Sequence, residues 1–140
     1  MPDADSPTFW QFELPHTAEA VPMARSLVRD ALAELDEPAD RDTAELLTAE
    51  LVTNAIQHTP GDQSVVLVVE LLTGGCRIEV HDRNPAPPGD LKNPESDPHA
   101  LAERGRGLVL IRALSSRAGY RATPRGKAVW FTLHPPGEPR

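Results

Sequence analysis

Hydrophobic and polar residues alternate in several short segments of the chain, and this period of two predicts β-strands with one buried face. In the first segment, Trp10, Phe12 and Leu14 share one side. Glycine-containing turns separate the second segment from the third and the fourth from the fifth, so each pair is expected to form a hairpin. The expected strands cover residues 8–14, 64–72, 76–82, 120–123 and 128–133.

Three other segments repeat their hydrophobic residues every three or four positions, which predicts helices. They cover about residues 21–35, 41–58 and 105–114. Asp40 is the expected N-cap of the second helix. Together these elements predict an α+β fold, a two-layer sandwich in which three helices cover one face of a mixed, mostly antiparallel five-stranded sheet.

The predicted domain occupies residues 8–134, between a flexible N-terminus (1–7) and a flexible tail (135–140). Between the third strand and the third helix, residues 85–104 form a polar, proline-rich segment. Such a segment is too long for an idle connection, and long loops of this kind often serve as lids or binding segments.

Composition narrows the classes of function. The 140 residues carry a formal net charge of -7, which argues against broad, phosphate-driven binding of nucleic acid. The single cysteine, Cys76, has no partner for an internal disulfide and fits a reducing compartment. The chain shows no apolar run of membrane-spanning length and no signal-peptide core. We therefore expect a cytoplasmic protein that contacts neither nucleic acid nor membrane directly.

Glu50 and Asn54 lie one turn apart in the predicted helix 41–58, so their side chains project from nearly the same side. A carboxylate and an amide oxygen placed this way can share a hard cation and the phosphate that it carries. The alternative is a solvated helix face, where most charged side chains lie. Because the helix is otherwise strongly apolar, the pair indicates a nucleotide site built on a helix, without a P-loop.

Asp82 continues the inward-facing row of strand 76–82. A buried carboxylate needs a donor, which an adenine amino group supplies; a cap satisfied by backbone N–H groups is the alternative. Further along, Gly105-Arg106-Gly107-Leu108 leads into a helix, where glycines allow close approach and free N–H groups can meet phosphate. A flexible junction between loop and helix is the alternative there.

Several other residues receive structural assignments. His58 is expected to interact with the dipole at its helix end, and His16 to be structural or solvated. Arg106 and Lys127 could neutralise phosphate, but solvent exposure is the expected state of both. The aromatic residues expected in the core are Trp10, Trp130 and Phe131.

The order of these motifs resembles the ATPase domain shared by gyrase, histidine kinases and MutL, the GHKL superfamily. The motifs are Glu50-xxx-Asn54, Asp82, a variable loop and Gly105-Arg106-Gly107-Leu108. The chain is most similar to the small anti-sigma-factor serine kinases of bacteria and, among them, to the stand-alone ATP-binding regulators of actinobacteria. The likeness runs from about Phe9 to Leu133 and implies the Bergerat ATP-binding fold.

The resemblance also implies roles for individual residues. Asn54 would hold the Mg²⁺ that bridges the phosphates of ATP, and Glu50 would be the general base that activates the attacking hydroxyl. Asp82 would accept a hydrogen bond from the adenine amino group. Residues 85–104 would form the ATP lid. The residues that would line the phosphates are Gly105, Arg106, Gly107 and Leu108.

Two departures from the family pattern concern nucleotide affinity more than the fold. The family's Asp motif usually continues with glycines, as DxGxG, whereas here Asp82 is followed by Arg83-Asn84-Pro85-Ala86. A threonine usually follows the pair Gly126-Lys127, and its hydroxyl supports the adenine site, but this chain has Ala128.

The resemblance implies an ATP-dependent regulator of partner switching. Such a protein would bind a sigma factor and phosphorylate a serine or threonine of a STAS-type anti-sigma-factor antagonist, and it is compatible with a homodimer. The first alternative is a non-catalytic, nucleotide-sensing interaction module of the same fold. The second is an ATPase in which water replaces the protein hydroxyl.

Overall fold

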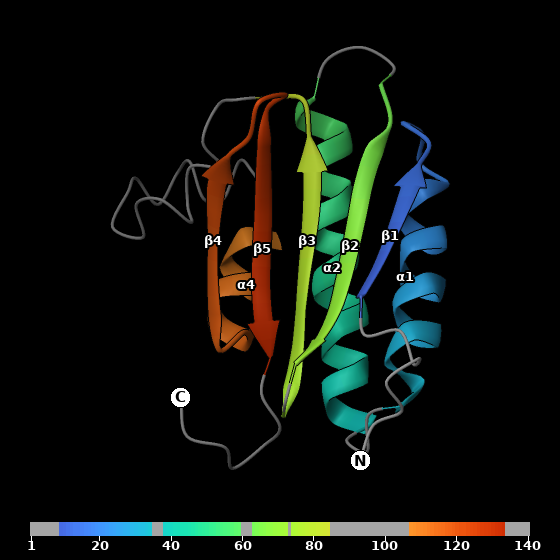
Figure 1. Ribbon diagram of the computed structural model, residues 1–140, viewed down its shortest axis with the longest axis vertical. Coiled ribbons are helices and arrows are strands. Elements are labelled where there is room, and N and C mark those ends of the chain that lie inside the picture. The colour runs from blue at the N-terminus through green and yellow to red at the C-terminus, as the bar shows by residue number, and fades with distance from the viewer. Residues whose placement is uncertain (1–8, 35–37, 60–62, 73, 85–106, 134–140) are drawn as a thin grey trace.

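The computed structural model describes residues 9–34, 38–59, 63–72, 74–84 and 107–133, which form a sheet and a layer of helices (Figure 1). The strands lie in the order β1-β2-β3-β5-β4. Their bounds are β1 (Phe9–Leu14), β2 (Val65–Leu72), β3 (Gly75–Asp82), β4 (Arg117–Ala122) and β5 (Lys127–Leu133). The five predicted strands and both predicted hairpins are therefore confirmed.

Every neighbouring pair of strands in this sheet is antiparallel, so the expected mixture of directions is wrong for the described strands. The reason lies in the connections. Two helices, one running back along the sheet and one returning, join β1 to β2, so β2 starts at the end where β1 stopped (Figure 1). Tight turns reverse the chain between β2 and β3 and between β4 and β5. β5 also pairs antiparallel with β3, so β4 runs in the same direction as β3 on the other side of β5.

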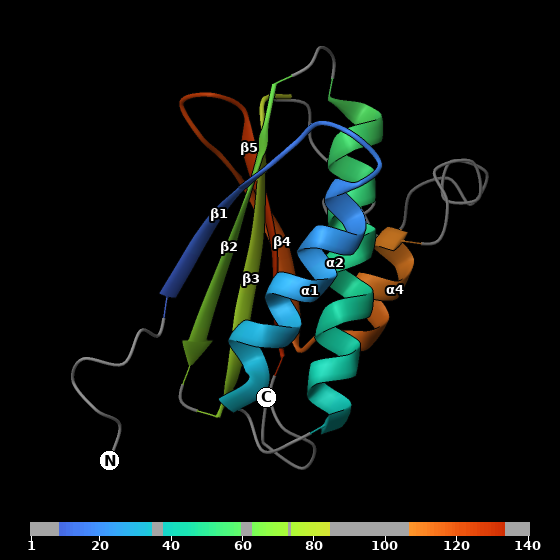
Figure 2. The same cartoon turned by 90° about the vertical axis from the view of Figure 1, so that its right-hand side faces the viewer.

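Helices cover one face of the sheet and leave the other face open among the described residues (Figure 2). Two of them are long, α1 (Ala20–Ala31) and α2 (Pro38–His58), and α4 (Gly107–Leu114) is shorter. A 3-10 turn at Leu32–Glu34 follows α1. The prediction that Asp40 is an N-cap is wrong, since α2 already begins at Pro38. Proline suits the first turn of a helix, where its missing N–H costs no hydrogen bond.

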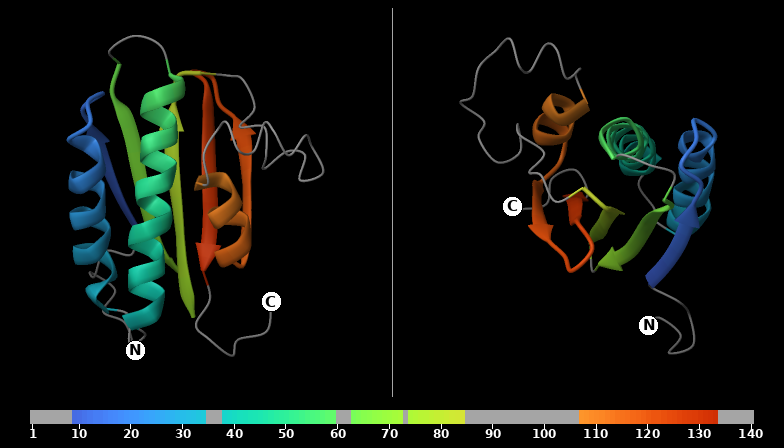
Figure 3. Two further views of the ribbon diagram at one scale, coloured as in Figure 1. Left: turned by 180° about the vertical axis from the view of Figure 1, so that it is seen from behind. Right: turned by 90° about the horizontal axis from the view of Figure 1, so that it is seen from above.

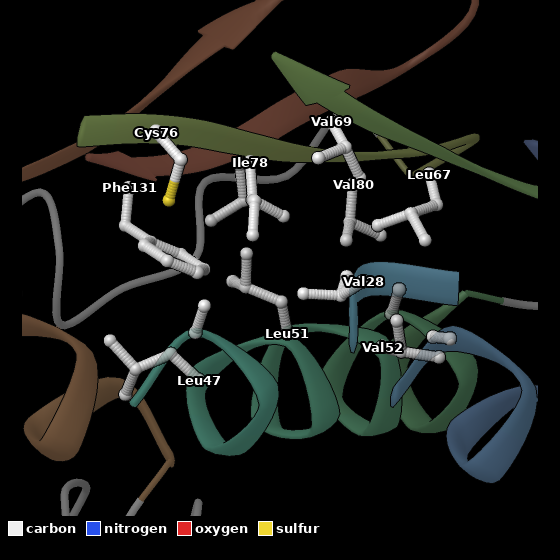
Figure 4. Close-up of a cluster of buried hydrophobic side chains, with 14 of the residues drawn as sticks. Val28, Leu47, Leu51, Val52, Leu67, Val69, Cys76, Ile78, Val80 and Phe131 are labelled. Carbon is white, nitrogen blue, oxygen red and sulfur yellow. The ribbon is translucent and has the colours of Figure 1, made fainter. Parts of the chain in front are cut away.

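The core lies between the two layers, where side chains of α1 and α2 meet those of the central strands (Figure 4). Leu51 and Val52 of α2 are buried against Ile78 of β3 and Phe131 of β5. Burying one such side chain contributes about 1.5–3 kcal/mol, so this contact holds α2 firmly on the sheet. The position of α2 matters because two predicted site residues lie on it.

Strand parity corrects one aromatic assignment. Phe131 is fully buried, and Trp10 packs against the core, as predicted. Trp130 does not, because successive residues of a strand point to opposite faces. It lies on the open face, where the guanidinium of Arg77 stacks over its ring, 4.1 Å from the centroid.

The last hairpin also differs from its prediction. β4 begins at Arg117, three residues before the expected Tyr120, and Lys127 belongs to β5, not to the turn. None of the described helices is both long enough and apolar enough to cross a membrane.

Candidate functional site

Asn84, just beyond the end of β3, ties three elements together. Its backbone N–H donates to Oδ1 of Asp82 at 2.8 Å, and its side-chain amide donates to the carbonyl oxygen of His58 at 2.7 Å. Its own carbonyl oxygen accepts from Nζ of Lys127 at 3.0 Å. The end of β3, the end of α2 and the start of β5 are thereby held at one place.

Asp82 is buried on the helix side of β3, at the end of the row formed by Cys76, Ile78 and Val80, as its parity predicts. Its carboxylate contacts the ammonium of Lys127, which is 3.1 Å from Oδ1 and 3.1 Å from Oδ2. The explanation of Asp82 as a cap is confirmed in part, since the carboxylate accepts one backbone N–H, that of Asn84. Its interaction with an adenine amino group stays a prediction.

Lys127 is 5% exposed, so the expectation that it would be solvated is wrong. It lies directly across from Asp82 in the pairing of β3 with β5 and therefore on the same face of the sheet. A lysine is rarely buried unless it is paired, and here the carboxylate supplies the counter-charge. The sequence signal that would have revealed it is parity, because Lys127 shares its side of β5 with Val129 and Phe131.

Gly126 brings the turn between β4 and β5 against the backbone of the site. A Cβ at this position would be 2.2 Å from the carbonyl oxygen of Asp82 and 2.6 Å from Cα of Arg83. Only a residue without a side chain allows this approach. Gly126 therefore sets how closely Lys127 lies to the end of β3.

Glu50 and Asn54 are both half-buried on α2. The opposite flank of this helix carries Glu45, which accepts two hydrogen bonds from Arg29 of α1, at 2.8 and 3.0 Å. These bonds lower the pKa of the Glu45 carboxyl. Nine residues make about two and a half turns, so Asn54 projects away from α1. Figure 3 shows α2 between α1 and α4, which places this flank toward α4.

Asn54 lies one turn before His58, about 6 Å along the helix axis, and Glu50 lies one turn before Asn54. The three residues thus form a column that leads along α2 to the end joined to Asp82 by Asn84. His58 is exposed and lies in the last turn of α2, and its interaction with the helix dipole stays a prediction. His16 is structural, since its ring nitrogens lie 3.0 and 3.1 Å from two carbonyl oxygens.

The predicted phosphate-binding junction is described in part. Gly107 is the first residue of α4 and Leu108 lies in its first turn, and this helix contacts α2. Gly105, Arg106 and the predicted lid, residues 85–104, lie outside the described residues. Within the described ranges, no group of three or more His, Cys, Asp or Glu side chains is arranged to hold a metal ion.

A second polar cluster, which the sequence did not reveal, occupies the open face of the sheet. Glu79 is 8% exposed and accepts hydrogen bonds from Arg77 at 2.9 Å and Arg121 at 2.8 Å, and it lies 2.9 Å from Nε2 of His81. The bond with His81 and those with the two arginines hold the pKa of Glu79 far below its usual value. A hollow of about 490 Å³ lies beside this cluster, bordered by residues that include Glu13, Ser64 and Arg125.

The chain was then compared with known proteins. The family model of the histidine kinase-like ATPase domain matches residues 14–133, which is most of the chain. The chain belongs to this family. The resemblance noted from the motif order is thereby confirmed at the level of the ATPase superfamily, and so is the predicted sandwich of sheet and helices.

Among solved structures, the crystal structure of the RsbU and RsbW domains of Rv1364c from Mycobacterium tuberculosis is similar to this histidine kinase-like ATPase domain. The TM-score is 0.68 at 22% sequence identity, and the match covers 92% of this chain but 32% of the other. At this identity the likeness supports the fold alone. A comparison with curated proteins found no match.

Proposed function

We propose that this histidine kinase-like ATPase domain binds ATP and transfers its γ-phosphoryl group to a serine or threonine of an anti-sigma-factor antagonist. The observation that carries the proposal is the column of Glu50 and Asn54 on the flank of α2 that faces away from α1, which leads to the end of the helix that Asn84 joins to the buried carboxylate of Asp82. Asn84 thus links Asp82, which would bind the base, to His58 at the end of the helix whose Glu50 and Asn54 would act at the phosphates. The family match to an ATPase domain supports the ligand.

Each residue would have a defined task. Asp82 would accept a hydrogen bond from the base, and the oxygen of Asn54 would hold Mg²⁺ on the phosphates, where the ion offsets charge that develops during transfer. The carboxylate of Glu50 would accept the proton of the attacking serine or threonine hydroxyl. The hydroxyl oxygen would then bond to the γ-phosphorus as ADP leaves. Gly105, Arg106, Gly107 and Leu108 would line the phosphates.

The partners follow from the same proposal. A regulator of this kind would hold a sigma factor in one state and phosphorylate a STAS-type antagonist in the other, as a monomer or homodimer in the cytoplasm. The similarity of fold to a structure that contains an RsbW domain supports this reading.

The direct test is phosphoryl transfer from γ-labelled Mg-ATP to the STAS-type antagonists of the same organism. Glu50→Gln removes the proton acceptor with little change of shape, so transfer should fall by about 10²–10⁴ while ATP still binds. Glu70→Gln, on the opposite face of the sheet, is the matched control and should transfer at the wild-type rate. Equal transfer by Glu50→Gln and wild type would remove Glu50 from the catalytic role.

A non-catalytic, nucleotide-sensing module is the second candidate, and two observations favour it. The carboxylate of Asp82 already has an internal cationic partner in Lys127, and Ala128 lacks the hydroxyl that supports the base in relatives. Calorimetry separates the two. Mg-dependent ATP binding with transfer supports the kinase, whereas binding without transfer to any antagonist supports the module.

A further inference from the structure

The ammonium of Lys127 is fully satisfied by groups of the protein. An ammonium carries three N–H donors, and Nζ of Lys127 lies 3.1 Å from Oδ1 of Asp82, 3.1 Å from Oδ2 and 3.0 Å from the carbonyl oxygen of Asn84. Three acceptor atoms thus stand against three donors. Lys127 therefore needs no ligand, and it holds both oxygens of the carboxylate that would bind the base.

The carboxylate of Asp82 is enclosed together with this ammonium. Its side chain is 3% exposed, and Oδ1 also accepts the backbone N–H of Asn84 at 2.8 Å. The amino group of a base must come within about 3 Å of a carboxylate oxygen to donate a hydrogen bond, and so little exposed surface leaves no room for it. Among the described residues, Lys127 is the side chain that contacts both oxygens. It is therefore the group that a base would displace.

The main chain around Lys127 is held too closely to supply this movement. Lys127 pairs with Asp82 in the register of β5 on β3, and a Cβ at Gly126 would lie 2.2 Å from the carbonyl oxygen of Asp82. What remains is rotation of the lysine side chain, whose four-carbon stem is flexible. Because rotation separates two buried opposite charges, the open state is the minor one. A ligand that needs a minor state binds more weakly, by the reciprocal of the fraction of that state.

We propose that Lys127 competes with the base for the carboxylate of Asp82 and thereby sets a low affinity for adenine nucleotides. The proposal rests on the proposed nucleotide site and deepens it by naming the residue that regulates access to it. Minor states of two-state proteins are commonly populated at about 0.1–10%, which corresponds to a weakening of about ten- to a thousandfold. The domain would then take up ATP only where the nucleotide is abundant.

The test compares Mg-ATP with the Mg²⁺ complex of purine riboside triphosphate, which lacks the 6-amino group, by calorimetric titration of the full chain. A hydrogen bond from the amino group to a free carboxylate raises affinity by about ten- to a hundredfold. In wild type, where Lys127 holds the carboxylate, we expect the two dissociation constants to agree within about threefold. A preference for ATP of about tenfold or more would show that Asp82 is open to the base. That result would overturn the proposal and leave the ATP site intact.

Lys127→Met tests the residue itself, since it keeps the length of the side chain and removes the ammonium. With the carboxylate released, ATP should bind at least about tenfold more tightly than to wild type, and the preference for ATP over the analogue should rise by a similar factor. Unchanged or weaker binding of ATP would overturn the proposal. Arg125→Met, an exposed position in the adjacent turn, is the control and should change neither dissociation constant.

The remaining outcomes separate this proposal from the proposed function. Binding of ATP by Lys127→Met but not by wild type would support the competition and contradict phosphoryl transfer by the wild-type chain. Absence of binding by both would overturn the proposal and the proposed function together. If Lys127→Met fails to fold, Lys127→Gln keeps a neutral donor beside the carboxylate and should still bind ATP more tightly than wild type. The comparison of the two nucleotides in wild type decides the proposal if neither variant folds.

Discussion

Strand β3 buries two carboxylates, Glu79 and Asp82, three residues apart and on opposite faces of the sheet. Both are at most 8% exposed, yet their surroundings differ. Among the described residues, Glu79 contacts two arginines and His81, all from β3 and β4, whereas Asp82 contacts one cationic side chain, that of Lys127 in β5.

The difference shows how a structural carboxylate can be distinguished from a candidate binding group. The partners of Glu79 are 28–49% exposed, so water reaches them and each can adjust. Lys127, the partner of Asp82, has a side chain that is only 6% exposed, and the Asp82 side chain is 3% exposed. The charges of the first cluster can therefore exchange partners with water, whereas the two charges of the second depend on each other.

The largest expected effects on stability come from removing each of the two carboxylates, and their sizes should differ. Asp82→Ala leaves Lys127 charged, buried and without its counter-ion, and we expect the free energy of unfolding to fall by about 3–5 kcal/mol. Glu79→Ala should cost less, about 1–3 kcal/mol, because its partners can return to water. Urea denaturation at pH 7 measures both.

The double variant Asp82→Ala/Lys127→Met provides the control for this prediction. It removes the unpaired charge, so it should recover most of the stability lost by Asp82→Ala. A larger loss for Glu79→Ala than for Asp82→Ala would contradict the distinction between the two sites.

The close approach of the β4–β5 turn to Asp82 gives the next largest effect. Gly126→Ala would place Cβ against main-chain atoms of Asp82 and Arg83, which cannot rotate away, and we expect a loss of about 1–3 kcal/mol. Gly119→Ala is the matched control. Its Cβ would be 2.9 Å from a ring carbon of Trp130, a side chain that can shift, so its loss should be smaller. Thermal unfolding of both variants measures the two losses of stability. Equal losses would show that the β4–β5 turn can shift away from Asp82, which contradicts the rigid contact at Gly126.

Sequence patterns predicted the elements and their faces well because period and parity are local. The alternation of residues 76–82 placed Asp82 on the helix side, and the helical repeat placed Glu50 and Asn54 together on α2. The partners of Asp82 could not be predicted in the same way. Lys127 is 45 positions away in the chain, and its burial follows from the register of β5 on β3, which no local pattern fixes.

The burial of Glu79 could not be predicted from the sequence for a related reason. The parity of β3 puts it on the open face, where a glutamate is usually solvated. It is buried because Arg77 and Trp130 cover one side and Arg121 of the edge strand β4 covers another. That cover requires the strand order β3-β5-β4, in which the last strand of the sequence lies inside the sheet.

Acid should affect the Glu79 cluster through its titration. The pKa of Glu79 is lowered in the folded protein, so this group stabilises the fold above its unfolded pKa of about 4.3 and loses that contribution as pH falls toward the folded pKa. Glu79→Gln removes the effect. The difference in unfolding free energy between wild type and this variant should therefore be constant near pH 7 and shrink below about pH 5. A difference that stays constant down to pH 2 would show that Glu79 gains nothing from ionisation.

The smallest expected change in stability concerns the two arginines that donate hydrogen bonds to Glu79, since replacing each by lysine should have a different cost. Arg77 places two nitrogens within 2.9 Å of Oε2 and also stacks on Trp130, whereas Arg121 is held at 2.8 Å through one nitrogen. Lysine keeps the charge but loses both the fork of donors and the flat stacking surface. Arg77→Lys should therefore cost about 0.5–1 kcal/mol and Arg121→Lys less. In the background of Trp130→Leu the cost of Arg77→Lys should fall toward that of Arg121→Lys, since the stacking is already lost; an undiminished cost would assign the whole effect to the carboxylate.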